Sequence, residues 1–187
     1  EGTVLSTSNL LDAIGILTKD GGYKPERFVY ASSSMVYGDF QYMPVDESHP
    51  TLPKEIYGTM KLTGEIVTRG LSEFYGVDHT IVRPSAVYGP TDMNQRVTQI
   101  FLEKALKGEN LKIQGKNEKL DFTFVEDLAE GCVLAAKSKR AENNIFNITF
   151  GKAQTLHKYV KILSKYFKNL SFSFEDRDQL RPRRGTL

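Results

Sequence analysis

The 187-residue sequence predicts an α/β protein in which part of a doubly wound parallel sheet is joined to a smaller α+β lobe. Two observations predict this class. A β-rich run at residues 27–31, a long helical pattern at 55–75 and a second β-rich run at 77–82 follow one another, and this order implies a right-handed crossover and a parallel pair of strands. After Gly89 and Pro90 the elements become shorter and less regularly spaced, which is typical of a separate small lobe.

The first expected element is a helix, because Leu10, Leu11, Ile14 and Leu17 keep helical spacing. A turn at 19–22 follows it, and the run at 27–31 has the composition of a buried strand. Serines come directly after this strand. Residues 39–53 are rich in structure breakers and are predicted to form a long loop before the helix at 55–75.

Six further elements are expected beyond residue 90. The spacing of apolar residues predicts helices over about 95–107, 126–137 and 155–167, and strands over 111–114, 144–149 and 170–174. No internal repeat or low-complexity tract interrupts this pattern.

The composition excludes several classes of protein. Twenty-five Lys and Arg against 23 Asp and Glu give a net charge of +2, so we expect neither nucleic acid nor a membrane surface as a partner. The single cysteine, Cys132, rules out an intrachain disulfide, and no apolar run reaches the roughly 20 residues of a membrane span. The three histidines are scattered, so no metal site is expected. These features predict a cytoplasmic protein.

The residues with the clearest chemical meaning are Tyr57 and Lys61. Positions i and i+4 share one face of a helix, so the ammonium group of Lys61 is expected near the phenol of Tyr57. A cation beside the ring favours the phenolate form and makes the tyrosine usable as a base or acid. A serine hydroxyl at the carboxyl end of the preceding strand is well placed to hold a substrate oxygen against that phenol.

A tyrosine and a lysine at this spacing are common, and the joint pattern is far more specific. The helix motif Tyr57-Gly58-Thr59-Met60-Lys61 is preceded by Ala31-Ser32-Ser33-Ser34-Met35-Val36-Tyr37-Gly38 and followed by Arg83-Pro84-Ser85-Ala86-Val87-Tyr88-Gly89-Pro90 and by Leu120-Asp121-Phe122-Thr123-Phe124-Val125-Glu126-Asp127. This combination resembles the extended short-chain dehydrogenases/reductases, and within them the NAD-dependent epimerase/dehydratase family.

The resemblance implies a Rossmann-type sheet. Residues 1–90 are then the carboxyl-terminal half of the dinucleotide-binding domain with the catalytic motifs, and residues 91–187 are mainly the substrate-binding lobe, with some return to the sheet. The family's Gly-rich turn, Gly-x-x-Gly-x-x-Gly, does not occur in the sequence. We therefore expect the amino-terminal βαβ half to be missing, and the chain alone to be inactive and to bind a dinucleotide poorly.

By the same resemblance, Tyr57 is the acid/base, Lys61 orients the nicotinamide ribose, and Ser33 supplies the hydroxyl, with Ser32 and Ser34 as alternatives. The implied cofactor is NAD, and NADP is left open. The residues expected to contact it are Ala31, Ser32, Ser33, Tyr57, Lys61, Pro84, Ser85 and Val87.

Departures from the family pattern narrow the reaction. Dehydratases of this branch commonly carry an acidic residue where this sequence has Met35, so we favour a nucleotide-sugar epimerase, most simply a 4-epimerase. The alternatives are a nucleotide-sugar reductase or dehydrogenase, a 4,6-dehydratase, and a non-catalytic nucleotide-binding relative. The last is disfavoured because such relatives typically lose the tyrosine or the lysine.

The nucleotide-diphosphate sugar is expected to meet Ser34, Met35, Ala86, Arg96, Lys119 and Arg183, the last paired with Arg184. Ala86 and Leu120 stand where family members often have Asn and Arg, so the nucleotide is left open. The resemblance also implies a homodimer through the helix that carries Tyr57 and Lys61, with Ile66, Arg69 and Glu73 along the seam.

Overall fold

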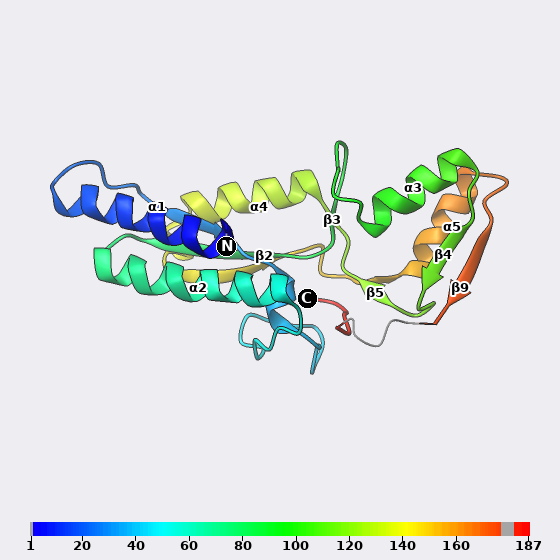
Figure 1. Cartoon of the computed structure of the whole chain (residues 1–187), viewed down its shortest axis with the longest axis horizontal. Coiled ribbons are helices and arrows are strands. Elements are labelled where there is room, and N and C mark those ends of the chain that lie inside the picture. Colours follow the sequence, from blue (N-terminus) through cyan, green and yellow to red (C-terminus); the bar gives the residue numbers. More distant parts are fainter. Residues whose placement is uncertain (1, 177–181) are drawn as a thin grey trace.

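The computed structural model describes residues 2–176 and 182–187, and it confirms the predicted α/β class. The molecule is elongated, with α1, α2 and α4 around a central sheet in one half and α3 and α5 in the other (Figure 1). The helices are α1 (Gly2–Lys19), α2 (Ile56–Tyr75), α3 (Val97–Lys107), α4 (Val125–Lys137) and α5 (Leu156–Tyr166), with short 3-10 turns η1 (Ser34–Tyr37) and η2 (Lys139–Ala141). None of the helices in the described residues is long and apolar enough to cross a membrane.

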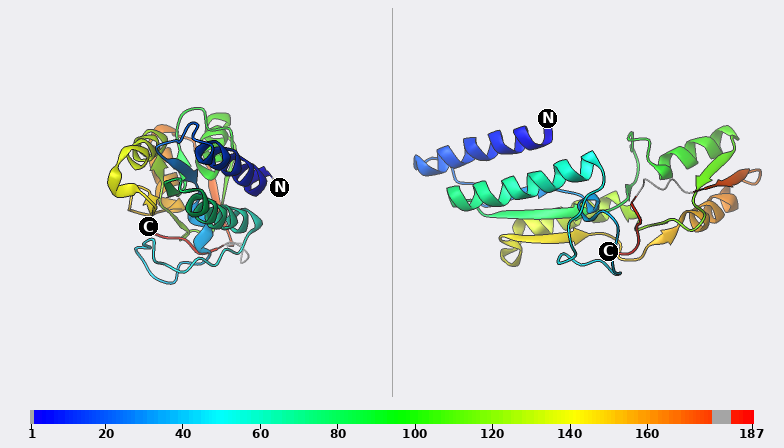
Figure 2. Two further views of the ribbon diagram at one scale, coloured as in Figure 1. Left: turned by 90° about the vertical axis from the view of Figure 1, so that its left-hand side faces the viewer. Right: turned by 60° about the horizontal axis from the view of Figure 1, so that its bottom comes forward.

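The central sheet contains three parallel strands in the order β1-β2-β7. These are β1 (Phe28–Ala31), β2 (His79–Pro84) and β7 (Asn144–Ile148). Pairing of β1 with β2 confirms the parallel pair that the strand-helix-strand order predicts. Seen along the long axis, α2 and α4 lie on opposite faces of the sheet (Figure 2). Because the three strands are parallel, their carboxyl ends lie at one edge of the sheet, and this edge is directed toward the second half of the molecule (Figure 1).

Alternation along the strands explains this layering, because successive side chains point to opposite faces. Tyr30 lies against Gly64 of α2, where an added Cβ would come 2.0 Å from the tyrosine oxygen. Thr80 points to the other face and donates to the carbonyl of Ala141, 2.6 Å away, just beyond α4. The two neighbouring strands β1 and β2 are thus covered by α2 on one face and by the α4 side on the other.

The helices α1 and α2 pack side by side, as Figures 1 and 2 show. Gly15 permits the close approach, since a Cβ there would lie 2.1 Å from the ring of Tyr75. The Tyr75 hydroxyl also donates to Asp12, at 3.1 Å. Helix α2 ends at Gly76, whose left-handed backbone (φ 68°) suits glycine.

The second half of the molecule is a small lobe with its own core. Strand β4 (Leu111–Gln114) pairs in parallel with β9 (Phe172–Glu175), and β5 (Lys119–Leu120) pairs antiparallel with β8 (Gln154–Thr155). The buried core of the lobe consists of Phe101, Leu111, Ile113, Leu156, Val160 and Leu163. The side chains that alternate with this core in β4, Lys112 and Gln114, stay exposed, and Lys112 forms an ion pair with Glu175 at 3.5 Å.

The sequence predicted some return to the sheet after residue 90, and two elements lie there. Strand β7 returns to the central sheet, and α4 packs on that sheet rather than in the lobe. The lobe proper is therefore built from two separated stretches, 97–120 and 154–175. The sequence pattern also did not predict η1, η2, β3 (Val87–Tyr88), β5, β6 (Thr123–Phe124) or β8, because strands of two residues and single 3-10 turns are too short to show a period.

Candidate active site

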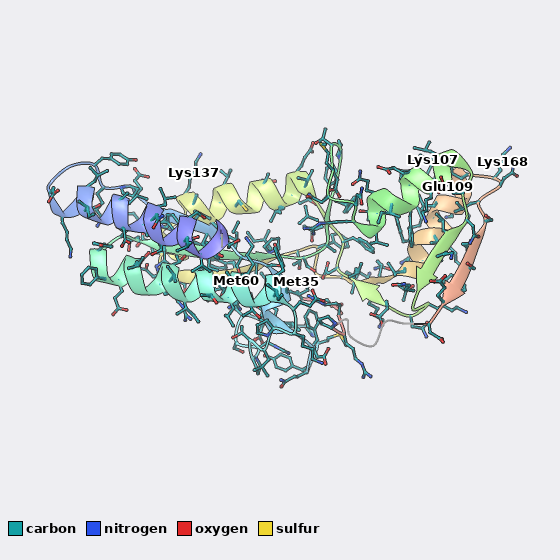
Figure 3. The ribbon with its side chains drawn as sticks, in the orientation of Figure 1. Met35, Met60, Lys107, Glu109, Lys137 and Lys168 are labelled. Atoms are coloured by element: carbon teal, nitrogen blue, oxygen red, sulfur yellow. The ribbon has the colours of Figure 1, made fainter. Side chains whose placement is uncertain are left out.

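The first wall of the site is the serine-rich turn between β1 and η1. Ser33 caps η1, and its hydroxyl oxygen accepts a hydrogen bond from the backbone N–H of Met35 at 3.2 Å. Ser32, Ser33 and Ser34 are all buried. Gly38 closes the turn with φ 67°, where a Cβ would lie 1.9 Å from the Leu52 carbonyl oxygen, so only glycine fits. Figure 3 places Met35 in the middle of the molecule, beside the start of α2.

The second wall is the first turn of α2, which carries Tyr57. Gly58 lets this turn approach η1, because a Cβ there would come 2.4 Å from the carbonyl oxygen of Met35. Tyr57 is 49% exposed, and its ring centroid lies 5.8 Å from the Lys61 ammonium nitrogen. The Lys61 ammonium also donates to the carbonyl of Ala31 at 2.7 Å. This hydrogen bond joins α2 to the end of β1, one helical turn after Tyr57.

Electrostatics at this junction follow from burial. The pKa of Lys61 is lowered, because burial disfavours its charged form. Tyr30, whose ring centroid lies 5.5 Å from the Lys61 nitrogen, has its pKa raised to about 12, mainly by burial and further by the negative charge of Glu65. Tyr30 therefore stays protonated at neutral pH.

The third wall is the segment after β2. Pro84 ends β2, Ser85 is buried, and the chain continues into β3, which pairs in parallel with β6. Ala86 between them has φ 34°, a left-handed conformation that strains any residue with a Cβ. The strained residue lies at the carboxyl edge of the sheet, the edge at which open α/β sheets bind ligands.

Together these walls and the lobe enclose a cavity of about 900 Å³. This volume lies within the usual range of small-molecule sites. The sheet side contributes Ser32, Ser33, Ser34, Met35, Glu55, Tyr57, Pro84, Ser85, Ala86 and Val87, and the lobe side contributes among others Arg96, Phe101, Lys112, Gln114, Glu118, Leu120 and Phe122. Pro182 and Arg184 reach the cavity from the end of the chain.

Most of the residues predicted from the sequence meet at this cavity. Ser32, Ser33, Ser34, Met35, Tyr57, Pro84, Ser85, Ala86, Val87 and Arg96 all line it. Ala31 and Lys61 do not line it, although each is close in sequence to a lining residue, and the Lys61 ammonium donates to the Ala31 carbonyl. Their assignment to catalysis, cofactor or substrate stays a prediction.

Lys119 and Arg183 lie outside the wall. Lys119 is exposed on β5, and its neighbours Glu118 and Leu120 face the cavity instead. Arg183 is exposed, and its backbone N–H donates to Asp39 at 2.7 Å, while Arg184 lines the cavity. The sequence therefore indicated the Arg183/Arg184 pair as a contact for a charged ligand, and the structure shows that Arg184 is the one that lines the cavity.

Several lining residues were missed by the sequence reasoning. The strict alternation over 111–114, with Leu111 and Ile113 buried, could have placed Lys112 and Gln114 together on the ligand side. Glu55, two residues before Tyr57, had no such signal. Arg184 was named from the sequence only as the neighbour of Arg183. Its guanidinium contacts the sulfur of Met35, and burial lowers the pKa of Arg184.

The residues of this site lie mostly within a stretch of the chain that matches a known protein family. A model of the NAD dependent epimerase/dehydratase family matches residues 1–149. A putative UDP-glucose 4-epimerase from Methanocaldococcus jannaschii is 36% identical over 160 residues, which are 83% of this chain and 52% of that protein.

Two solved structures are similar over almost the whole chain. A UDP-glucose 4-epimerase from Thermotoga maritima, solved with UDP-glucose, has a TM-score of 0.86 and 25% identity, covering 99% of this chain and 60% of that one. A UDP-glucose 4-epimerase from Thermus thermophilus, solved with NAD, has a TM-score of 0.82 and 25% identity, with the same coverage of 99% and 60%. The chain thus spans little more than half the length of these relatives.

Proposed function

Because the chain belongs to the NAD-dependent epimerase/dehydratase family, we propose that the protein is an NAD-dependent nucleotide-sugar 4-epimerase. The observation that carries the proposal is the arrangement of Ser33 and Tyr57 on one cavity, with Lys61 tied to the strand end behind them. Similar proteins are named as UDP-glucose 4-epimerases, which supports a UDP-sugar as the substrate.

The residues at the carboxyl edge of the sheet fit a nicotinamide nucleotide by their chemistry. Lys61 uses one of its three N–H donors on the Ala31 carbonyl, which leaves donors for the hydroxyls of a ribose. Ser85 and Val87 line the cavity and are the further residues expected to meet the nucleotide. When bound there, NAD would take up the hydride from the sugar carbon and return it to the other face.

Within this proposal the chain's own residues hold the sugar and move one proton. Tyr57, reacting as the phenolate with the Lys61 ammonium 5.8 Å from its ring centroid, accepts the proton of the sugar 4-hydroxyl as the carbon is oxidised. The Ser33 hydroxyl donates a hydrogen bond to the same sugar oxygen and keeps it in line with the phenol. After the keto sugar has turned over in the cavity, Tyr57 returns the proton.

The nature of residue 35 favours epimerisation. Dehydration needs a further acid or base near the sugar, and the thioether of Met35 transfers no proton. Glu55 is the one observation in favour of a 4,6-dehydratase, since its carboxylate lines the cavity two residues before Tyr57. The two reactions give different products, so they can be separated directly.

The test is to incubate the purified full-length protein with NAD and with separate samples of UDP-glucose, UDP-glucuronate and UDP-N-acetylglucosamine, and to follow the products by proton NMR. The 187-residue chain alone is not used, because we expect it to bind the dinucleotide poorly. We expect the 4-epimer of at least one sugar, without net NADH accumulation at 340 nm. Stoichiometric NADH would indicate a dehydrogenase, a 4-keto-6-deoxy sugar would indicate a dehydratase, and no turnover of any sugar would contradict an enzymatic role.

Tyr57→Phe is the matched control for this assay. The phenol oxygen is lost while the ring is kept, and Tyr57 is half-exposed, so the fold should be unaffected. Turnover should fall by about 10² to 10⁴. Unchanged turnover would remove Tyr57 from the mechanism.

We also propose that the protein forms a homodimer through α1 and α2. Large apolar side chains are exposed on these two helices, among them Leu5, Leu10, Ile16, Ile66 and Phe74. Such exposed apolar surface favours a partner. Sedimentation at micromolar concentration should give a dimer, Ile66→Glu should give a monomer, and Val133→Glu on α4 should leave the dimer intact. A monomeric native protein would refute the proposal.

A further inference from the structure

A buried ion pair lies directly behind the cavity. The Glu65 carboxylate and the Arg83 guanidinium form two parallel hydrogen bonds, at 2.9 Å from Nε and 2.6 Å from Nη2. The side chains are only 0% and 4% exposed. Neither residue lines the cavity, so the pair does not contact a ligand there.

The pair is connected to the residues that do line the cavity. Glu65 follows Tyr57 by eight residues and Lys61 by four, so all three lie near one face of α2. The Ser32 hydroxyl donates to the Glu65 carboxylate. The helix that carries Tyr57 is thereby tied to the residue next to Ser33.

On its other side the pair reaches η1 and β7. Arg83 donates from Nη1 to the Tyr37 hydroxyl at 2.9 Å, and Tyr37 donates to Asn147 at 2.8 Å. Tyr37 is fully buried and ends η1, the turn that Ser33 caps. One carboxylate and one guanidinium therefore connect α2, the end of β1, η1, β2 and β7.

Stability alone is a weak reason for such an arrangement. Desolvating two charges is costly, and well-packed apolar residues of similar volume are often as stable or more stable. A fully satisfied polar network does favour a single geometry, because moving one member weakens its hydrogen bonds to all the others. Catalysis is sensitive to this, since a displacement of about 1 Å can cost about a hundredfold in rate.

We propose that Glu65 and Arg83 are positioning residues that set the placement of Ser33 relative to Tyr57 and Lys61. This inference rests on the proposed epimerase function. The pair acts through Ser32 on one side and through Tyr37 and η1 on the other. It holds the hydroxyl and the phenol at the spacing that one sugar oxygen requires.

The first experiment is to replace both charges together in the double variant Glu65→Met/Arg83→Met, which leaves no unpaired charge. We expect a folded protein in which kcat falls by about a hundredfold while KM for the UDP-sugar changes by less than about threefold. The matched control is Arg27→Met/Glu142→Gln, which removes a second ion pair with a buried arginine, near the start of β1 (3.1 Å). The control should lower the melting temperature and leave kcat within about threefold.

A second experiment compares the effect of Ser32→Ala on kcat in the native protein and in the double variant. This comparison distinguishes a positioning role from a general loss of order. Ser32→Ala should lower kcat by about tenfold in the native protein, the rate equivalent of one hydrogen bond. In the double variant the same change should have less than about a twofold effect, because the partner of Ser32 is already gone. Full multiplication of the two effects would overturn the inference, as would native kcat in the folded double variant.

Tyr37→Phe keeps the test decisive if the double variant does not fold. Tyr37 does not line the cavity, and only one hydroxyl is lost, so we expect a folded protein with kcat lowered by about tenfold and KM unchanged. A native kcat in this variant would overturn the inference. Absence of turnover in the native protein is a different result, because it would refute the proposed function on which the inference rests.

Discussion

Two glycines of α2 provide the sharpest test of the packing between helix and sheet. A Cβ added at Gly64 would lie 2.0 Å from the oxygen and 2.5 Å from Cζ of Tyr30. A Cβ added at Gly70, six residues later in the same helix, would meet nothing within 4 Å. The substitution of alanine is chemically the same at both sites, so any difference between them comes from the tertiary contact.

The expected magnitudes follow from this geometry. Alanine is favoured over glycine within a helix by about 1 kcal/mol, so Gly70→Ala should stabilise the protein by about that amount. Gly64→Ala has the same gain but forces apart α2 and the buried Tyr30, and such overpacking costs about 1–3 kcal/mol. The two variants should therefore differ by about 1–3 kcal/mol in their free energies of unfolding.

Urea unfolding followed by circular dichroism measures both values. For a protein of this size, thermal melts should show a separation of about 2–4 °C for each kcal/mol. If Gly64→Ala were as stable as Gly70→Ala, then α2 would not pack on β1 as closely as Gly64 allows, and the position of Tyr57 relative to the strand end would need revision.

Three further predictions address the site and its surroundings. Lys61→Met removes the ammonium that contacts Ala31, and turnover should fall by about 10² or more without loss of the fold; unchanged turnover in kinetic assays would contradict the role of Lys61. Ala86→Gly relieves the strain of φ 34° and should raise the free energy of unfolding by about 1 kcal/mol in urea titrations, whereas a loss of stability would show that Ala86 is not strained. Burial raises the pKa of the Asp121 carboxyl above its ordinary 3.8, so its stabilising contribution is complete below that pH and is lost as pH rises through the raised pKa. The stability of the native protein relative to Asp121→Asn should therefore decrease from pH 4 to pH 7 in unfolding measurements, and a constant difference would contradict it.

Local patterns in the sequence predicted the longer elements well. The helices and strands expected at 55–75, 111–114, 126–137 and 144–149 all form, with ends shifted by at most one residue, because three or more turns or alternations report directly on burial. The strand expected at 77–82 is formed at 79–84, and that at 170–174 is formed at 172–175. These ends are set by pairing with neighbouring strands, which a local pattern does not contain.

Some features of the candidate site could likewise be predicted from local sequence, and others could not. Local sequence was enough to place Tyr57 and Lys61 on one helix face and the serines after a strand, because both statements depend on neighbours within a few residues. The choice of Arg184 over Arg183 at the cavity, and the pairing of Glu65 with Arg83, came from the three-dimensional structure. These contacts join segments whose separation in space is set by strand order and helix packing, so their partners follow from the whole fold and from no single stretch of the chain.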